Sequence, residues 1–302
     1  MGDGVSTVSA RAGLPPALVA LRPKQWLKNV LVFAAPAAAE VLDQRTAVVD
    51  ALLAFGAFCA GASAIYLVND LLDVEADRRH PTKRYRPIAS GTLAPATAWV
   101  MAVVLAVASV VLALLTGEPT FLLVIAIYVV TSVVYSWWLK HEPIIDLVVV
   151  ASGFLLRAIG GAVAVDVPVS SWFLIVISFG SLFVVAGKRL VELEEMGDDA
   201  VHVRPTLDHY TVPFLRFVLA VACTATAVAY CIFAFERAGL SADGSVWFQL
   251  SAIPVVTALL RYALAVEAGE AAAPEDVFTK DRTLQILGLI WAVLFGVGLL
   301  RG

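Results

Sequence analysis

The sequence predicts an all-α integral membrane protein built from nine transmembrane helices. Of its 302 residues, 60% are hydrophobic and 15% are charged, whereas soluble domains usually carry about 25% charged residues. The mean hydropathy is +0.87, so lipid must solvate much of the apolar surface. The formal net charge of −4 provides no overall basic field, so we expect no nucleic-acid partner.

Nine windows are long and apolar enough to cross a bilayer, which takes about 20 mainly apolar residues. Short links, many of them marked by proline or glycine, separate these windows. The first window is the weakest, because Lys28 and Asn29 lie in its first turn. The nine expected spans are about 25–41, 47–69, 96–116, 119–138, 143–165, 170–190, 212–236, 245–266 and 283–300.

The distribution of lysine and arginine indicates how the chain is oriented. Arg45, Arg237 and Arg301 would lie on one face and Arg157 within a span, which leaves 17 of the 21 cations for the other face. Loops on the cytoplasmic side of a membrane carry such an excess of cations. We therefore expect a multi-pass protein of the cell (plasma) membrane, with its N-terminus in the cytoplasm and its C-terminus outside.

We expect one polytopic membrane domain over residues 1–302, in which 1–24 form a cytoplasmic N-terminal segment. The two longest links, 70–95 and 191–211, both fall on the cytoplasmic side and are dense in acids and bases. Orientation alone does not require such links, so they are candidate active-site loops. The three cysteines lie in apolar runs and the four histidines are scattered, so neither residue type indicates a disulfide or a zinc site.

The first of these loops opens with acidic residues at helical spacing, in the stretch NDLLDVEAD. Asp70, Asp73 and Asp77 would share one face of a helix that continues out of the membrane, with Asn69 beside them. Three stacked carboxylates repel one another, and a divalent cation removes that repulsion. Since Mg²⁺ is held by carboxylates together with water and substrate phosphates, the stretch predicts a Mg²⁺ site, with Mn²⁺ as the alternative ion.

Cations follow these acids directly. The stretch RRHPTKRYRP contains Arg78, Arg79, Lys83, Arg84 and Arg86. Because guanidinium and ammonium groups bind phosphate oxygens, acids and cations together indicate a diphosphate site. A loop that only fixes orientation would explain the cations but not the aspartates, since acids contribute little to orientation.

The second loop mixes charges in the stretch GKRLVELEE. Lys188 and Glu192 form an i,i+4 pair, and Arg189 and Arg204 add anion-binding capacity. Taken alone, a solvated helix end explains this stretch as well as a binding site does. Because it lies on the same side of the membrane as the aspartates, we expect it to form the second wall of a pocket.

Polar residues also occur at and within the spans. We expect Lys24, Tyr135 and Lys140 at the cytoplasmic rim. Arg157 lies deep in a span, where a charge costs about 2.5–3.5 kcal/mol, so it should face the interior of the bundle and have a partner. Asp146 is on the same helical face but too far along the axis, so we expect that partner to come from another helix.

On these residues the sequence resembles the UbiA superfamily of intramembrane prenyltransferases. The family motif N-D-x-x-D-x-x-x-D is complete from Asn69 to Asp77, and the expected basic and proline residues follow through Pro87. The nine expected spans cover the whole chain. The resemblance implies a UbiA-type bundle of nine helices with an active-site cavity on the cytoplasmic side.

The second family motif, D-x-x-x-D after the sixth helix, is replaced here by KRLVE, residues 188–192. This departure is similar to the branch that transfers 5-phosphoribosyl from phosphoribosyl diphosphate to decaprenyl phosphate. That reaction brings additional phosphate groups, and Lys188 and Arg189 would lower the repulsion among them. The segments that also look like this branch are RPKQWLKN, YSWWLKHEPIIDLVVVASGFLLRAIGG, RPTLDHY and PEDVFTKDRTLQ.

The resemblance implies a Mg²⁺-dependent glycosyltransferase that inverts C1, releases diphosphate and supplies a lipid-linked precursor of the arabinose donor for cell-wall arabinan. Its expected partners are phosphoribosyl diphosphate, a polyprenyl phosphate and membrane lipids; self-association is left open. The expected metal ligands are Asn69, Asp70, Asp73 and Asp77. The expected catalytic residues are Asn69, Asp73, Asp77 and Lys188. The expected substrate-binding residues are Lys24, Lys83, Arg86, Tyr135, Lys140, Lys188, Arg189, Glu192 and Arg204.

Two other functions stay open at this point. One is transfer of a polyprenyl group from a prenyl diphosphate to an aromatic acceptor, within the same superfamily. The other is transport, with Arg157 and the acids as a charge pathway. Internal repeats and broken helices would support transport, and the sequence contains no repeat at a fixed period.

Overall fold

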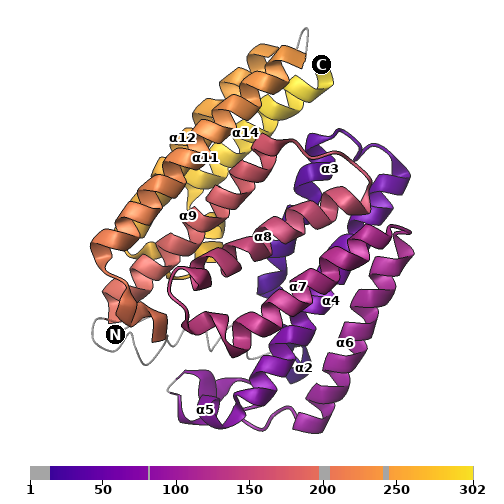
Figure 1. Cartoon of the computed structure of the whole chain (residues 1–302), viewed down its shortest axis with the longest axis vertical. Helices are drawn as coiled ribbons and strands as arrows, with labels where there is room; N and C mark the ends of the chain where they lie inside the picture. The colour runs from indigo at the N-terminus through magenta and orange to yellow at the C-terminus, as the bar shows by residue number, and fades with distance from the viewer. Residues whose placement is uncertain (1–13, 81, 197–204, 241–244, 302) are drawn as a thin grey trace. The chain divides into compact units, whose positions relative to one another are not determined.

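The computed structural model describes residues 14–80, 82–196, 205–240 and 245–301 (Figure 1). The described residues form helices and turns, with no strand among them. The chain divides into two compact units. Unit 1 consists of Met1–Ser136 and Arg157–Val167, and unit 2 consists of Trp137–Leu156 and Pro168–Gly302. The expectation of a single membrane domain stays a prediction.

Unit 1 is built around a pair of long helices. Its elements are α2 (Pro16–Leu21), η1 (Pro23–Phe33), α3 (Ala34–Ala38), α4 (Arg45–Leu72), α5 (Val74–Arg79), η2 (Lys83–Tyr85), α6 (Pro95–Leu115), α7 (Pro119–Trp137, of which Trp137 falls in unit 2) and the second half of α8 (Ile145–Ala164). Pro95 starts α6 at a position where its missing N–H costs nothing. After α6, the chain turns at Gly117, whose φ of +77° favours glycine.

Small residues let α4 and α6 pack closely. α4 buries a run of alanines, and a Cβ on Gly61 would lie 3.1 Å from the Ser109 hydroxyl of α6. The same hydroxyl donates to the Ala57 carbonyl at 2.8 Å. Small residues and a buried hydroxyl are the usual means of holding helices together in lipid, and here they fix the helix that carries the acidic motif.

The first predicted span, 25–41, is not one regular α-helix. The segment consists of the 3₁₀ stretch η1 followed by the short helix α3. A 3₁₀ stretch of 11 residues is long, since such runs seldom exceed about four. Whether this segment crosses the membrane stays a prediction.

Unit 2 contains the remaining long helices. Its elements are η3 (Leu139–His141), the first half of α8, α9 (Ser171–Met196), η5 (Pro205–His209), α11 (Val212–Leu240), α12 (Ser245–Glu267), η6 (Glu270–Ala272), α13 (Pro274–Lys280) and α14 (Arg282–Arg301). α9, α11, α12 and α14 run side by side (Figure 1). Their core is apolar and includes Phe183, Leu219 and Tyr262. α9 continues to Met196, so the expected loop at 191–211 begins as helix.

Eight helices among the described residues are long and apolar enough to cross a membrane: α4, α6, α7, α8, α9, α11, α12 and α14. They correspond to the second through ninth predicted windows. Their outer faces are apolar as well; on α6, for example, Val100, Val103, Val107 and Leu114 are exposed. Such faces suit contact with lipid rather than water.

Candidate active site

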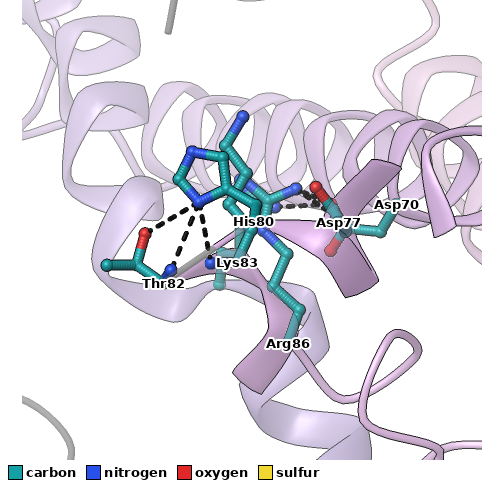
Figure 2. Close-up of polar contacts among 7 residues, drawn as sticks. Asp70, Asp77, His80, Thr82, Lys83 and Arg86 are labelled. Carbon is teal, nitrogen blue, oxygen red and sulfur yellow. Dashed lines mark hydrogen bonds and ion pairs between the residues drawn. The ribbon is translucent and has the colours of Figure 1, made fainter. Parts of the chain in front are cut away.

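A cluster of carboxylates and arginines lies where α4 ends, in unit 1. The Asp70 side chain is 3% exposed and accepts hydrogen bonds from Arg22 at 2.6 Å and from Arg86 at 3.0 Å. The same Arg86 nitrogen, Nη1, lies 2.7 Å from Asp77 Oδ2 (Figure 2). One guanidinium therefore bridges two buried carboxylates through charge-assisted hydrogen bonds. This brings together Asp70, Asp77 and Arg86, all three of which the sequence indicated.

The three aspartates of the motif, Asp70, Asp73 and Asp77, do not lie on one continuous helix. α4 ends at Leu72, and Asp73 has dihedral angles of φ −92° and ψ 8°. The Asp73 N–H still donates to the Asn69 carbonyl at 2.9 Å, and the Asp77 N–H donates to the Asp73 carbonyl at 2.8 Å. The prediction of a continuing helix is wrong at Asp73, a residue type that competes with the helix for backbone groups. Asp73 is exposed.

Asn69 connects α4 to α7. Its Nδ2 atom donates to the Ser136 hydroxyl at 3.1 Å, and the Ser136 hydroxyl in turn donates to the Ser132 carbonyl. Tyr135, the neighbour of Ser136, is half-buried near the same end of α7. The amide of Asn69 is thus fixed in direction beside the aspartates of the motif.

The loop after α5 is organised by His80. Its Nδ1 atom accepts hydrogen bonds from the Thr82 and Lys83 N–H groups at 3.2 and 3.3 Å (Figure 2). Burial and the neighbouring Lys83 cation lower the pKa of His80 below its usual value, which keeps Nδ1 unprotonated as an acceptor. Arg78 also holds the loop, donating to the Ala89 carbonyl at 3.3 Å. Lys83 and Arg86 are therefore presented from an ordered turn.

The donor set of this cluster suits a divalent cation. Carboxylate oxygens are the preferred protein ligands of Mg²⁺, and Asp70 and Asp77 already share one cationic group, the Arg86 guanidinium. No three histidine, cysteine, aspartate or glutamate side chains in the described part of the chain lie close enough together to hold a metal ion. A Mg²⁺ ion here would therefore take one or two carboxylates and complete its shell with water and substrate oxygens.

Sequence reasoning missed Arg22 as a site residue. It is in the left-handed conformation, with φ +55°, at the junction of α2 and η1. Its guanidinium reaches Asp70 and lies 4.7 Å from the centre of the Tyr66 ring. The available signals were its position directly before Pro23 and its place in the segment RPKQWLKN. Lys24, which was predicted at the rim, is exposed two residues later.

The buried Arg157 has the partners that its depth requires. Its Nε donates to Asn29 Oδ1 at 2.6 Å, and its Nη2 donates to the Tyr128 hydroxyl at 3.0 Å. The guanidinium also lies 4.9 Å from the centre of the Tyr128 ring. Because Asn29 is in η1 and Tyr128 in α7, the expectation of a partner from another helix is confirmed.

One turn further along α8, Gly161 allows a close backbone approach. A Cβ at this position would lie 1.8 Å from the Val32 carbonyl oxygen, which leaves no room for any other residue without a backbone shift. Together, Arg157 and Gly161 hold η1 against the second half of α8 in unit 1. η1 begins directly after Arg22, so this contact supports the cluster of Arg22, Asp70, Asp77 and Arg86.

A second cluster of carboxylates and arginine lies in unit 2, at the end of α9. Arg189 Nε lies 3.3 Å from Asp146 Oδ2, and Arg189 Nη1 lies 2.8 Å from Glu192 Oε2. Glu192 Oε1 in turn lies 3.7 Å from Lys188 Nζ. The predicted Lys188–Glu192 pair is therefore present. The Lys188 side chain is 39% exposed, whereas that of Arg189 is 3% exposed.

Tyr210 holds the first turn of α8 in this cluster. Its hydroxyl donates to Asp146 Oδ1 and accepts the Ile144 N–H at 2.6 Å. Burial raises the pKa of the Tyr210 hydroxyl above its usual value, and the hydrogen bond to Asp146 raises it further, so the hydroxyl remains a donor. Sequence reasoning did not single out Tyr210; the segment RPTLDHY contained the only signal.

The other predicted site residues are more scattered. Lys140 lies in η3 of unit 2 and is half-buried. Arg204 lies outside the described residues. The structure thus brings the predicted residues together in two groups, one in each unit: Asn69, Asp70, Asp77 and Arg86 in unit 1, and Lys188, Arg189 and Glu192 in unit 2.

Comparison with known proteins extends over nearly the whole chain. The model of the UbiA prenyltransferase family matches residues 30–296. The chain is 47% identical over 276 residues to a decaprenyl-phosphate phosphoribosyltransferase of Corynebacterium glutamicum, covering 90% of this chain and 83% of that one. It is 46% identical over 287 residues to a protein of the same name from Mycobacterium tuberculosis, covering 94% of each chain.

The fold has a solved counterpart. A UbiA homolog from Archaeoglobus fulgidus, bound to GPP and Mg²⁺, superposes with a TM-score of 0.68 at 18% sequence identity, covering 95% of this chain and 99% of that one. Family match, sequence relatives and fold agree with one another and with the resemblance drawn from Asn69 to Asp77. With its apolar helices, the protein is a multi-pass membrane protein, and it belongs to the UbiA prenyltransferase family.

Proposed function

We propose that this protein transfers 5-phosphoribosyl from phosphoribosyl diphosphate to a polyprenyl phosphate, decaprenyl phosphate in particular, and releases diphosphate. The observation that carries the proposal is the identity of 46–47%, over 90–94% of the chain, to relatives named for that reaction. The charges at the end of α9 agree with it. Lys188 and Arg189 stand where other superfamily members have an acidic motif, which suits substrates that are rich in phosphate.

In this proposal the acidic cluster of unit 1 binds the donor's diphosphate. One or two carboxylates of the set Asp70, Asp73 and Asp77, with the Asn69 amide beside them, would hold Mg²⁺, or Mn²⁺ in its place. The bound ion would supply charge stabilisation to the departing diphosphate. Arg86 and Lys83 add cationic donors for its oxygens. Arg86 is 26% exposed and already lies between the two buried carboxylates, so its guanidinium can bind anions that approach from solvent.

We also propose phosphate contacts for residues of unit 2. Lys188 is the accessible cation of its cluster and is assigned a direct contact with a substrate phosphate. Arg189 is buried against Asp146 and Glu192, so we assign it the role of orienting Glu192. Lys24, Tyr135 and Lys140 complete the proposed substrate contacts. Arg204, in the same set, lies outside the described residues.

The reaction exchanges one C–O bond for another. The bond between C1 of the ribose and the diphosphate oxygen breaks, and the electron pair leaves with diphosphate. A phosphate oxygen of the lipid forms the new bond to C1 from the opposite face, which inverts the configuration. Because that oxygen is already anionic at neutral pH, no strong general base is required. Catalysis then depends on positioning and on electrostatic stabilisation of charge at C1 and at the leaving group.

We further propose that the protein lies in the plasma membrane, with its N-terminus and active site on the cytoplasmic side. The excess of lysine and arginine in alternate links supports this orientation. The product would then be a lipid-linked phosphoribosyl group, a precursor of the arabinose donor for cell-wall arabinan. Cysteines introduced into the links, labelled from one side of sealed vesicles, would test the orientation.

The proposed function can be tested with purified protein and two pairs of substrates. With Mg²⁺ present, phosphoribosyl diphosphate labelled in the ribose should yield a labelled lipid when decaprenyl phosphate is added. A labelled prenyl diphosphate with an aromatic acceptor should yield none. The opposite result would favour polyprenyl transfer to the aromatic acceptor. Absence of both products, with uptake of a substrate into vesicles, would favour transport.

A further inference from the structure

A buried carboxylate in unit 2 has three polar side-chain partners. Asp146 is 0% exposed. Its Oδ1 atom accepts the Tyr210 hydroxyl, and its Oδ2 atom lies 3.3 Å from both Arg189 Nε and the Thr206 hydroxyl. These partners come from α9 and from the segment that follows it. Asp146 therefore fastens three separate stretches of unit 2 together.

From this anchor, a chain of ion pairs runs toward solvent. Arg189 uses Nε for Asp146 and Nη1 for Glu192, so its two sides are directed to different carboxylates. Glu192 likewise uses Oε2 for Arg189 and Oε1 for Lys188. The exposed fractions of the side chains rise along this chain, from 0% at Asp146 and 3% at Arg189 to 16% at Glu192 and 39% at Lys188. Its exposed end is the ammonium group of Lys188.

The backbone near Asp146 is held in an unfavourable conformation. Ile144 has φ +67°, which is a genuine outlier for a β-branched residue. Its N–H donates to the Tyr210 hydroxyl at 2.6 Å, the same hydroxyl that donates to Asp146. Such strain persists where the surroundings fix one geometry. Here Tyr210 fixes the start of α8.

Stability alone gives a weak account of this arrangement. Buried ion pairs often contribute no more than apolar residues of similar volume would. Lysine, in contrast, has a flexible four-carbon side chain, and its ammonium is a point charge without a preferred direction. A fixed carboxylate beside it restricts where that charge lies. The chain of contacts supplies such a carboxylate, because Arg189 holds Glu192 from the buried side.

We propose that Asp146 and Tyr210 are positioning residues that act through Arg189 and Glu192 to hold the Lys188 ammonium where it meets a substrate phosphate. The identity of that phosphate rests on the proposed function. The chain of contacts up to Lys188 does not depend on it. Two measurements therefore separate the two ideas.

The first measurement is the reactivity of Lys188 toward an amine-acylating ester, followed by mass spectrometry. In the wild-type protein the Glu192 carboxylate restrains the ammonium and slows acylation. In Asp146→Asn, which keeps the size but removes the charge, Lys188 should react about 2- to 5-fold faster, the factor that the loss of a part-exposed ion pair corresponds to. Lys280, which pairs with Asp276 elsewhere in unit 2, is the internal reference. An unchanged ratio of Lys188 to Lys280 reactivity would overturn the proposal.

The second measurement is a double-mutant cycle on phosphoribosyl transfer. Asp146→Asn should lower kcat/KM about 10-fold in the wild-type background and less than 2-fold in Lys188→Gln, because the effect passes through Lys188. A merely structural role would lower both backgrounds equally, and that result would overturn the proposal. Asp276→Asn, which breaks the exposed pair with Lys280, is the matched control and should leave kcat/KM unchanged.

A milder variant covers the case in which Asp146→Asn fails to fold. Tyr210→Phe removes one hydroxyl and should raise Lys188 reactivity and lower kcat/KM in the same pattern, but by smaller factors. Size-exclusion chromatography in detergent should show that this variant is folded like the wild type. If Tyr210→Phe changes neither Lys188 reactivity nor the cycle, the positioning role is wrong. If the wild type makes no labelled lipid, the proposed function fails, while the acylation ratio still decides the role of Asp146.

Discussion

Both charged clusters pair arginines with buried carboxylates, but solvent reaches the arginines of the first cluster and not that of the second. In unit 1, Arg22 and Arg86 hold Asp70 while keeping 29% and 26% of their own side chains exposed. In unit 2, Arg189 pairs with Asp146, and their side chains are 3% and 0% exposed, respectively. Water and dissolved ions reach the cationic side of the first cluster and are excluded from the core of the second.

This difference separates two uses of an ion pair. In the first cluster the carboxylates are buried but the two arginines stay partly hydrated, so these arginines can exchange a carboxylate for a substrate anion at lower cost. A pair sealed from solvent has lost its hydration and is costly to separate. The first cluster is therefore suited to binding and releasing charged substrates, and the second to holding Glu192 and Lys188 in place.

The largest expected effect is on the stability of the buried unit 2 cluster of Asp146, Arg189 and Glu192. Asp146→Leu should lower the free energy of unfolding by about 3–5 kcal/mol, because it leaves the Arg189 charge buried and uncompensated. Adding Arg189→Met should recover most of that loss. In the unit 1 cluster, Asp70→Leu should lower the free energy of unfolding by about 1 kcal/mol, because Arg22 and Arg86 remain partly hydrated. Unfolding in mixed micelles would measure all three, and equal costs for Asp70→Leu and Asp146→Leu would contradict the comparison.

The next effect is on kcat and concerns the acids of the unit 1 cluster. Asp77→Asn and Asp73→Asn should each lower kcat about 100-fold or more, because each removes a negative charge that would hold Mg²⁺, and the ion would stabilise the departing diphosphate. Glu75→Gln is the matched control: this acid lies in the same segment, is 72% exposed and pairs with Arg78, three residues along the same helix. Its kcat should stay within about 2-fold of the wild type. Loss of activity in the control alone would place the important acid elsewhere.

A smaller effect is expected where η1 contacts α8 in unit 1. Gly161→Ala should destabilise the protein by about 1–3 kcal/mol, the usual cost of overpacking, since its Cβ would overlap the Val32 carbonyl oxygen. Gly288→Ala on α14 is the control, because nothing lies within 4 Å of its added Cβ. Thermal unfolding should leave Gly288→Ala at or slightly above the wild type. Equal behaviour of the two variants would mean that η1 is not held by this contact.

The smallest effect concerns pH. The pKa of His80 is lowered in the folded protein, so below about pH 6.5 the unfolded chain binds a proton that the folded loop resists. The contribution of this group to stability is therefore lost as pH falls below that value and is constant above it. His80→Asn should flatten the decline in stability between pH 7.5 and 5.5. A decline as steep as that of the wild type would assign it to other groups.

The sequence predicted most of the helical framework, because length and apolar composition alone define a span. It succeeded for the eight long helices and for the Lys188–Glu192 pair, whose members are one turn apart. The first window was different. Lys28 and Asn29 weaken its helical pattern. The 3₁₀ path of η1 depends on contacts with Arg157 and Gly161, more than 120 residues later.

The site was predictable for residues whose type indicates their chemistry and whose spacing along the chain brings them together. Asp70 and Asp77 were placed on one side by spacing, and Arg86 was expected to bind anions. The break at Asp73 and the contribution of Arg22 were not predictable, because both depend on how distant turns meet. Arg189 has the charge of a phosphate ligand, but its burial against Asp146 depends on packing between α8 and α9.

The most direct test of the central claim uses phosphoribosyl diphosphate that carries two different labels. One label is in the 5-phosphate and the other is in the diphosphate, and the acceptor is decaprenyl phosphate with Mg²⁺. We expect the 5-phosphate label to enter the lipid-extractable product while the diphosphate label stays in the aqueous phase as diphosphate. Diphosphate label in the lipid, or no transfer of either label by the folded protein, would contradict the proposed reaction.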